Sequence, residues 1–159
     1  MKRLHNPRKT VFKNGLTLIT VHIPSSPTVI VEVKVKTGSK NESKKQAGLS
    51  HFLEHMCFKA TKKRPTSKIL LGELDSIGAD YNAFTGTHAT GYYAKAQSGK
   101  VEKLIDIVAD IYTDPIFRKE DMEKEKGVII QEINMYEDDP QSVASTLFAK
   151  TAHGDQPAG

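Results

Sequence analysis

Two histidines and a glutamate lie within one five-residue segment, His51-Phe52-Leu53-Glu54-His55. On an α-helix, residues four apart share a face and lie about 6 Å apart along the axis, at about 1.5 Å rise per residue. The two imidazoles can then converge on one metal ion, while the Glu54 carboxylate reaches the same region. Such a site requires a helix here and a second element that faces it, because a metal centre needs at least one further ligand.

The order H-x-x-E-H reverses the H-E-x-x-H signature of zinc peptidases. Catalytic zinc typically has three protein ligands and one open position for water, and two histidines with one glutamate form an established set. The third ligand should be a carboxylate from another element, so that Glu54 stays free as a base. The acidic helix predicted over residues 118–136 offers Glu125 and Glu132, which share one helix face. One of the pair could bind the metal, and the other could hydrogen-bond a ligand histidine.

Other candidate ligands have a weaker context. Cys57 is the only cysteine, which excludes an internal disulfide. On a helix it would point about 200° away from His55, which favours a small buried residue over a metal ligand. The remaining histidines lack a motif and are expected to be exposed or locally hydrogen-bonded: His5, His22, His88 and His153.

Length and composition are typical of one globular domain. The chain has 159 residues, of which 38% are hydrophobic and 26% charged. No apolar run approaches the ~20 residues of a membrane span. Residues 1–7 also lack the apolar stretch of a signal peptide. We expect no membrane span and a cytoplasmic location by default, unless an export signal has been removed.

The net charge of +4 is unevenly distributed. Residues 1–65 hold fourteen Lys or Arg and three Asp or Glu, whereas residues 118–139 hold eight acids and four bases. The basic residues are dispersed among predicted turns and strand faces, and no nucleic-acid-binding motif accompanies them. A solvated surface is therefore favoured over a nucleic-acid-binding module.

Hydrophobic periodicity and turn signals predict the order of the elements. Strands are expected at residues 10–12, 16–23, 29–36, 80–85 and 89–97, and helices at 47–58, 65–77, 101–112, 118–136 and from 142 onward. Residues 38–45 are expected to form a polar loop. The helix over 101–112 should bury one face with Leu104, Ile105, Val108 and Ile111. This order predicts an α+β fold, with helices packed on an antiparallel sheet. Because residues 153–159 are turn-rich, we expect a single domain, residues 1–159, that is truncated at its C-terminal end.

Three segments resemble the pitrilysin/insulinase family of zinc peptidases, and most closely its processing peptidases. Residues 48–61 are similar to the family's G-L-(S/A)-H-F-L-E-H-(L/M)-x-F-K-G-T, with Ala60 in place of the usual glycine. Residues 78–85 resemble its G-A-x-x-N-A-x-T strand, and residues 125–133 resemble its helix with two glutamates. The segments occur in the family's order and spacing, and the resemblance covers nearly the whole chain.

The resemblance implies a role for each residue at the predicted site. His51, His55 and Glu132 would bind one Zn²⁺ per chain, Glu54 would be the general base, and Glu125 would support a ligand histidine. The family fold is a clamshell of two homologous halves around a chamber, each half made of two domains. This chain would then form most of one N-terminal, catalytic domain.

The family strand implies that Asn82 and Ala83 hydrogen-bond the backbone of a peptide substrate. This agrees with a physical expectation, because an exposed strand edge near a protease site can capture an extended peptide by strand addition. For Asn82, the alternative is a plain strand residue close to a turn.

The implied function is a zinc-dependent metalloendopeptidase that hydrolyses extended or unfolded peptides. The family also uses an Arg and a Tyr from the other half, and no segment here matches them. We therefore expect this chain to bind zinc but to hydrolyse peptides poorly alone. Full activity would require the second half or a partner subunit, in a homo- or heterodimer. The alternative is a non-catalytic peptide-binding or scaffold subunit of the same fold, whose usual mark is a broken H-x-x-E-H motif.

Overall fold

The computed structural model describes residues 6–154. His5 and the turn-rich residues 155–159 lie outside this range. The strands are β1 (Arg8–Val11), β2 (Thr17–Thr20), β3 (Thr28–Val35), β4 (Asp80–Thr85) and β5 (Thr90–Gln97). The helices are α1 (Leu49–Cys57), α2 (Ser67–Ser76), α3 (Val101–Thr113), α4 (Lys119–Glu137) and α5 (Pro140–His153), with short 3₁₀ helices η1 (Ser39–Asn41), η2 (Lys44–Gln46) and η3 (Ser98–Lys100). The predicted order of strands and α-helices is confirmed, while η1 and η2 occupy the predicted polar loop.

Local sequence signals account for several element ends. Thr66 caps α2, because its side chain accepts a hydrogen bond from the backbone N–H of Ile69. Gly78 follows α2 with φ of 62°, a left-handed conformation that glycine adopts without a steric penalty. Asp139 caps α5 in the same way as Thr66 caps α2, and Pro140 occupies the first turn.

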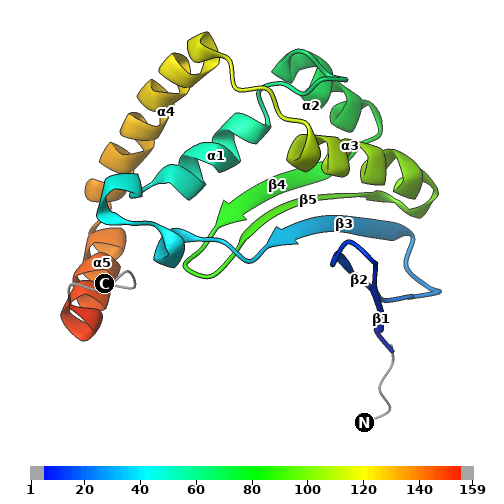
Figure 1. The fold of residues 1–159 in the computed structure, drawn as a ribbon, viewed down its shortest axis with the longest axis horizontal. Coiled ribbons are helices and arrows are strands. Elements are labelled where there is room, and N and C mark those ends of the chain that lie inside the picture. Colours follow the sequence, from blue (N-terminus) through cyan, green and yellow to red (C-terminus); the bar gives the residue numbers. More distant parts are fainter. Residues whose placement is uncertain (1–5, 155–159) are drawn as a thin grey trace.

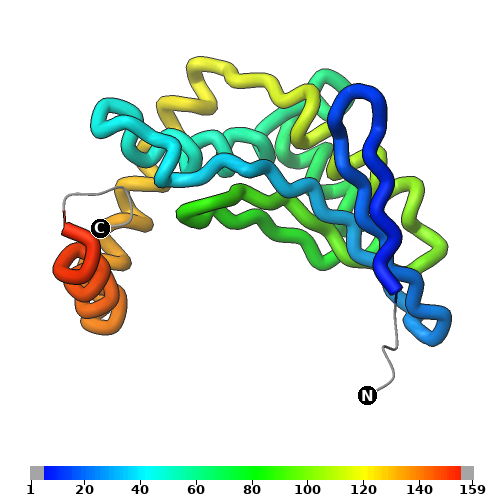
Figure 2. Tube along the Cα trace, turned by 60° about the horizontal axis from the view of Figure 1, so that its bottom comes forward, coloured from blue at the N-terminus to red at the C-terminus, as the bar shows by residue number. Residues whose placement is uncertain are grey.

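The strands form two separate antiparallel sheets. β3, β5 and β4 form a three-stranded sheet in that order, so β4 pairs only with β5 among the described residues. β1 and β2 form the predicted hairpin, in which Gly15 at the turn has φ of 86°. Figures 1 and 2 show this hairpin at the end of the molecule opposite α5. In the three-stranded sheet, β4 has one open edge, because β5 is the one strand that pairs with it among the described residues.

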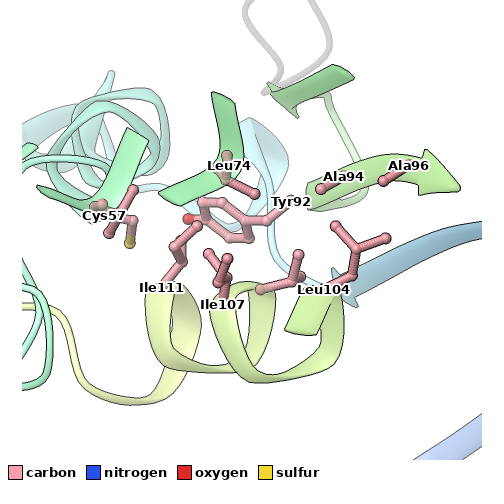
Figure 3. Close-up of a cluster of buried hydrophobic side chains, with 10 residues drawn as sticks. Cys57, Leu74, Tyr92, Ala94, Ala96, Leu104, Ile107 and Ile111 are labelled. Carbon is pink, nitrogen blue, oxygen red and sulfur yellow. The ribbon is translucent and has the colours of Figure 1, made fainter. Parts of the chain in front are cut away.

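Helices α1, α2 and α3 lie on one face of the three-stranded sheet (Figure 1). The core forms where α3 packs on this sheet, and Figure 3 shows its side chains. The buried cluster consists of Cys57, Leu70, Leu74, Tyr92, Ala94, Ala96, Leu104, Ile107, Val108 and Ile111. Burial of Cys57 confirms that it is a core residue. The prediction for the buried face of α3 was wrong at one position: Ile105 is 51% exposed, and Ile107 is buried instead. Residues 104, 107, 108 and 111 follow the i, i+3, i+4, i+7 pattern, whereas residue 105 lies about 100° away from residue 104.

Helix α4 runs past α1, and α5 turns away from the sheet (Figures 1 and 2). Glu125 is the one fully buried residue of α4. The apolar residues Val128, Ile130 and Ile133 are 51%, 55% and 49% exposed. Among the described residues, no helix is both long and apolar enough to cross a membrane.

Candidate metal centre

The two motif histidines meet on one face of α1, as the four-residue spacing predicts. The ring centroids of His51 and His55 lie 4.6 Å apart with an interplanar angle of 88°. Their Nε2 atoms are 3.1 Å apart. The side chains are 33% and 20% exposed, so the pair remains open to solvent.

Glu132 of α4 brings a carboxylate to these two nitrogens. Its Oε1 lies 3.7 Å from Nε2 of His51, and its Oε2 lies 3.4 Å from Nε2 of His55. Within residues 6–154, these three residues form the single group of three or more His, Cys, Asp or Glu able to hold a metal, with ligand atoms within 4.8 Å of one another. A set of two imidazoles and one carboxylate suits Zn²⁺.

Glu125 lies behind His55, on the opposite side of the ring from Glu132. Its Oε1 is 2.8 Å from Nδ1 of His55, and its Oε2 pairs with the ammonium of Lys59. Burial alone would raise the pKa of Glu125, but the hydrogen bonds from Lys59 and His55 outweigh burial and hold its pKa below the ordinary value. A carboxylate that accepts a hydrogen bond from Nδ1–H leaves the Nε2 lone pair of His55 free for a metal.

Glu54 does not belong to this group of three, and one oxygen of its carboxylate contacts β4. Its Oε2 accepts a hydrogen bond from the hydroxyl of Thr85 at 2.5 Å. Thr85 is the last residue of β4, and its hydroxyl also lies 3.5 Å from the backbone oxygen of Ser50. Glu54 therefore supplies a carboxylate next to the candidate ligands without belonging to their group.

Asn82 and Ala83 lie on β4, the strand of the sheet that packs against α1 (Figure 1). Asn82 is exposed, and its Oδ1 accepts a hydrogen bond from the backbone N–H of Ala83 at 2.8 Å. The structure thus places both residues on an edge strand beside the motif helix. The other described histidines, His22, His88 and His153, are exposed.

Three residues with contacts at this site, Lys59, Thr85 and Glu42, are not among the residues predicted from the sequence. Lys59 lies in the family-like segment 48–61, and Thr85 lies in the family-like segment 78–85. Their closeness in sequence to the predicted site residues is the signal that could have identified them. Glu42 lies in the predicted loop and had no such signal. Its Oε2 accepts from the N–H of Gly48 at 2.7 Å, and its Oε1 accepts from the N–H of Ser50 at 2.6 Å. Glu42 thereby satisfies donors at the N-terminus of α1 and places a negative charge at the positive end of its dipole.

Replacing Glu42 with alanine is expected to lower the free energy of unfolding by about 1 kcal/mol, the usual cost of a lost helix cap. Urea denaturation followed by circular dichroism measures this change. Glu123→Ala is the control, because Glu123 is exposed on α4 and pairs only with Lys126 among the contacts of the described residues. Equal effects of the two substitutions would contradict the capping role.

Comparisons with known proteins agree with the family resemblance and with the fold. The model of the insulinase family (Peptidase family M16) matches residues 17–159. A protein of Rickettsia felis named as an uncharacterized zinc protease is 42% identical over 147 residues, which cover 92% of this chain and 35% of the relative. The uncharacterized zinc protease YmxG of Bacillus subtilis is 35% identical over 147 residues, which cover 92% of this chain and 36% of the relative. The chain thus spans about a third of the length of these relatives.

Two solved structures share the fold. A protease from Helicobacter pylori superposes with a TM-score of 0.91 at 25% identity, over 98% of this chain and 38% of that protein. Pitrilysin superposes with a TM-score of 0.85 at 24% identity, over 99% of this chain and 17% of that protein, which shows the fold. The predicted α+β fold is confirmed, and the chain belongs to the insulinase family of peptidases, Peptidase family M16.

Proposed function

We propose that this protein is a zinc metalloendopeptidase in which His51, His55 and Glu132 hold the ion. The observation that carries the proposal is the convergence of three ligand atoms from α1 and α4 within 4.8 Å of one another. Two imidazoles and one carboxylate match the donor set of catalytic zinc sites. The partial exposure of all three side chains is consistent with a site that a substrate can enter.

Glu54, Thr85 and Glu125 have further roles in the proposed reaction. Zinc, when bound, polarises the scissile carbonyl and lowers the pKa of its water towards ~7. Glu54 accepts a proton from the attacking water and delivers it to the amine that leaves. The hydroxyl of Thr85 donates to one oxygen of Glu54 and leaves the other oxygen for this proton. Glu125 holds the ring of His55 through Nδ1.

The substrate we propose is an extended peptide that adds to the open edge of β4. Backbone hydrogen bonds give such a peptide affinity without a strong requirement for sequence. Asn82 and Ala83 would supply part of these bonds, since both lie on β4 beside α1. An extended or unfolded chain fits this mode, because a folded segment has already paired its own backbone groups.

Full hydrolysis would require a second half or a partner subunit that completes the chamber and supplies the family's Arg and Tyr. Two observations support this requirement. The chain spans about a third of its curated relatives. In addition, Leu147 and Phe148 of α5 are 58% and 75% exposed, and a second half or partner subunit would provide a surface to cover them. A non-catalytic subunit is disfavoured because the H-x-x-E-H motif is intact.

Metal analysis and chelation test the proposal. The purified protein is expected to contain one zinc per chain, and 1,10-phenanthroline is expected to remove the ion. Cleavage of an internally quenched extended peptide by the complete protein should stop on chelation and return when zinc is added. His51→Gln should lose the ion, whereas His88→Gln should retain it, because His88 is exposed and outside the site. A protein that binds no zinc would disprove the proposed function.

A further inference from the structure

Lys59 is linked to the candidate metal centre through the carboxylate of Glu125. It lies two residues beyond the C-terminal end of α1, and its ammonium pairs with Oε2 of Glu125. The other oxygen of Glu125 is 2.8 Å from Nδ1 of His55. The two oxygens of a single carboxylate are therefore divided between Lys59 and a candidate zinc ligand.

Burial makes this division important. The side chain of Glu125 is 5% exposed, so little water reaches it to replace a lost partner. A buried carboxylate oxygen without a donor is costly, which favours any side-chain rotation that finds a new donor. Removal of Lys59 would leave Oε2 of Glu125 without a hydrogen-bond donor. The carboxylate would then no longer be fixed at both ends, and the ring of His55 would lose its fixed orientation.

The backbone holds Lys59 in place. Its N–H donates to the carbonyl of Met56 at 3.1 Å, and the carbonyl of the next residue, Ala60, accepts from Ile116 at 2.8 Å. The segment after α1 is thus attached to the segment before α4. Two nearby lysines differ from Lys59: Lys62 and Lys63 are 75% and 64% exposed and pair with acids at the surface.

We propose that Lys59 is a positioning residue of the metal centre, which orients His55 through Glu125. This inference rests on the zinc site proposed above. The direction of the change in zinc affinity distinguishes a positioning role from a plain charge effect. Lys59 is a cation, so loss of its charge alone would strengthen the binding of another cation by Coulomb's law. Loss of positioning weakens it, typically by 10- to 100-fold for partners that orient a ligand histidine.

Competition with a chromophoric chelator at one fixed pH measures the zinc affinity. We expect Lys59→Met to weaken zinc binding by about 10- to 100-fold. Lys59→Arg keeps a charged donor and should restore an affinity near that of the wild type. Lys126→Met is the matched control: it removes the same charge from α4, but Lys126 pairs with the exposed Glu123. This control should bind zinc at least as tightly as the wild type.

A double-mutant cycle tests the route of the effect. In a Glu125→Gln background, Lys59→Met should cause little further loss of zinc affinity, because its partner carboxylate is already absent. Circular dichroism of the zinc-free variants establishes that each is folded, and Lys59→Gln serves as the second variant if Lys59→Met is not. Zinc binding by Lys59→Met, or by its substitute, that is equal to or tighter than wild type would overturn the inference and leave the proposed function standing. Failure of the wild type to bind zinc would instead overturn the proposed function.

Discussion

Replacing Glu54 with glutamine is expected to reduce the kcat of peptide hydrolysis by about 10²- to 10⁴-fold while zinc remains bound. Glutamine has nearly the same shape as glutamate, and its carbonyl oxygen can still accept the hydrogen bond that Thr85 donates. The neutral amide of glutamine, however, cannot act as a base and accept a proton from water. The measurement is kcat of the complete protein on a quenched extended peptide, together with the zinc content of the same sample.

The zinc content decides between two roles for Glu54. His51→Gln is the reference for loss of a ligand and should lose both the ion and the activity. Glu54→Gln should lose only the activity, because its carboxylate contacts Thr85 and lies outside the group formed by His51, His55 and Glu132. Loss of zinc together with activity in Glu54→Gln would mean that Glu54 is a ligand and that the role assigned to Glu132 is wrong.

Replacing Arg64 with methionine is expected to lower the free energy of unfolding by about 3–5 kcal/mol. Arg64 is 3% exposed and donates to Asp110 at 2.5 Å, to Asp106 at 2.6 Å and to Glu73 at 3.0 Å. Methionine would leave the 3% exposed Asp110 with only the hydroxyl of Thr61, which is 2.6 Å away. An uncompensated buried charge is the cause of the large effect. Hydrogen bonds from Lys63 and Arg64 lower the pKa of Asp106 to about 2, so its carboxylate is ionised at neutral pH.

Urea denaturation at pH 7 measures this loss, with Arg118→Met as the matched control. Arg118 is 43% exposed, and its guanidinium lies 3.8 Å from Asp121. An exposed ion pair of this kind contributes about 0–1 kcal/mol, so the control should change stability little. If Arg64→Met were as mild as Arg118→Met, the ion pairs of Arg64 with Asp106 and Asp110 would not anchor the loop between α1 and α2 to α3.

The position of the two histidines could be predicted from the sequence because their spacing alone sets their relation on a helix. The choice between Glu125 and Glu132 could not be made in this way. Both lie on one face of α4, so periodicity left open which one would bind the metal. The structure places Glu132 at the Nε2 atoms and Glu125 at Nδ1 of His55. That difference depends on how α4 lies against α1, which is a tertiary property.

Contacts between distant segments escaped prediction for a similar reason. The hydrogen bond of Thr85 to Glu54 joins β4 to α1, and the pairing of Lys59 with Glu125 joins a loop to α4. No spacing rule relates such residues. The exposed position of Ile105 has a different cause. Ile105 and Ile107 are equally apolar, so only their angles around the axis of α3 decide which one is buried.

The one buried residue of helix α4 is Glu125, whose carboxylate contacts His55 of α1 and Lys59 just after it. An ion shared by His51, His55 and Glu132 would therefore act as a cross-link between α1 and α4, two segments that lie far apart in the sequence. Metal occupancy and docking of α4 would then form one linked equilibrium. Each tenfold rise in free metal above the dissociation constant would add about 1.4 kcal/mol to the docked state, so metal supply would set how rigidly the site is assembled.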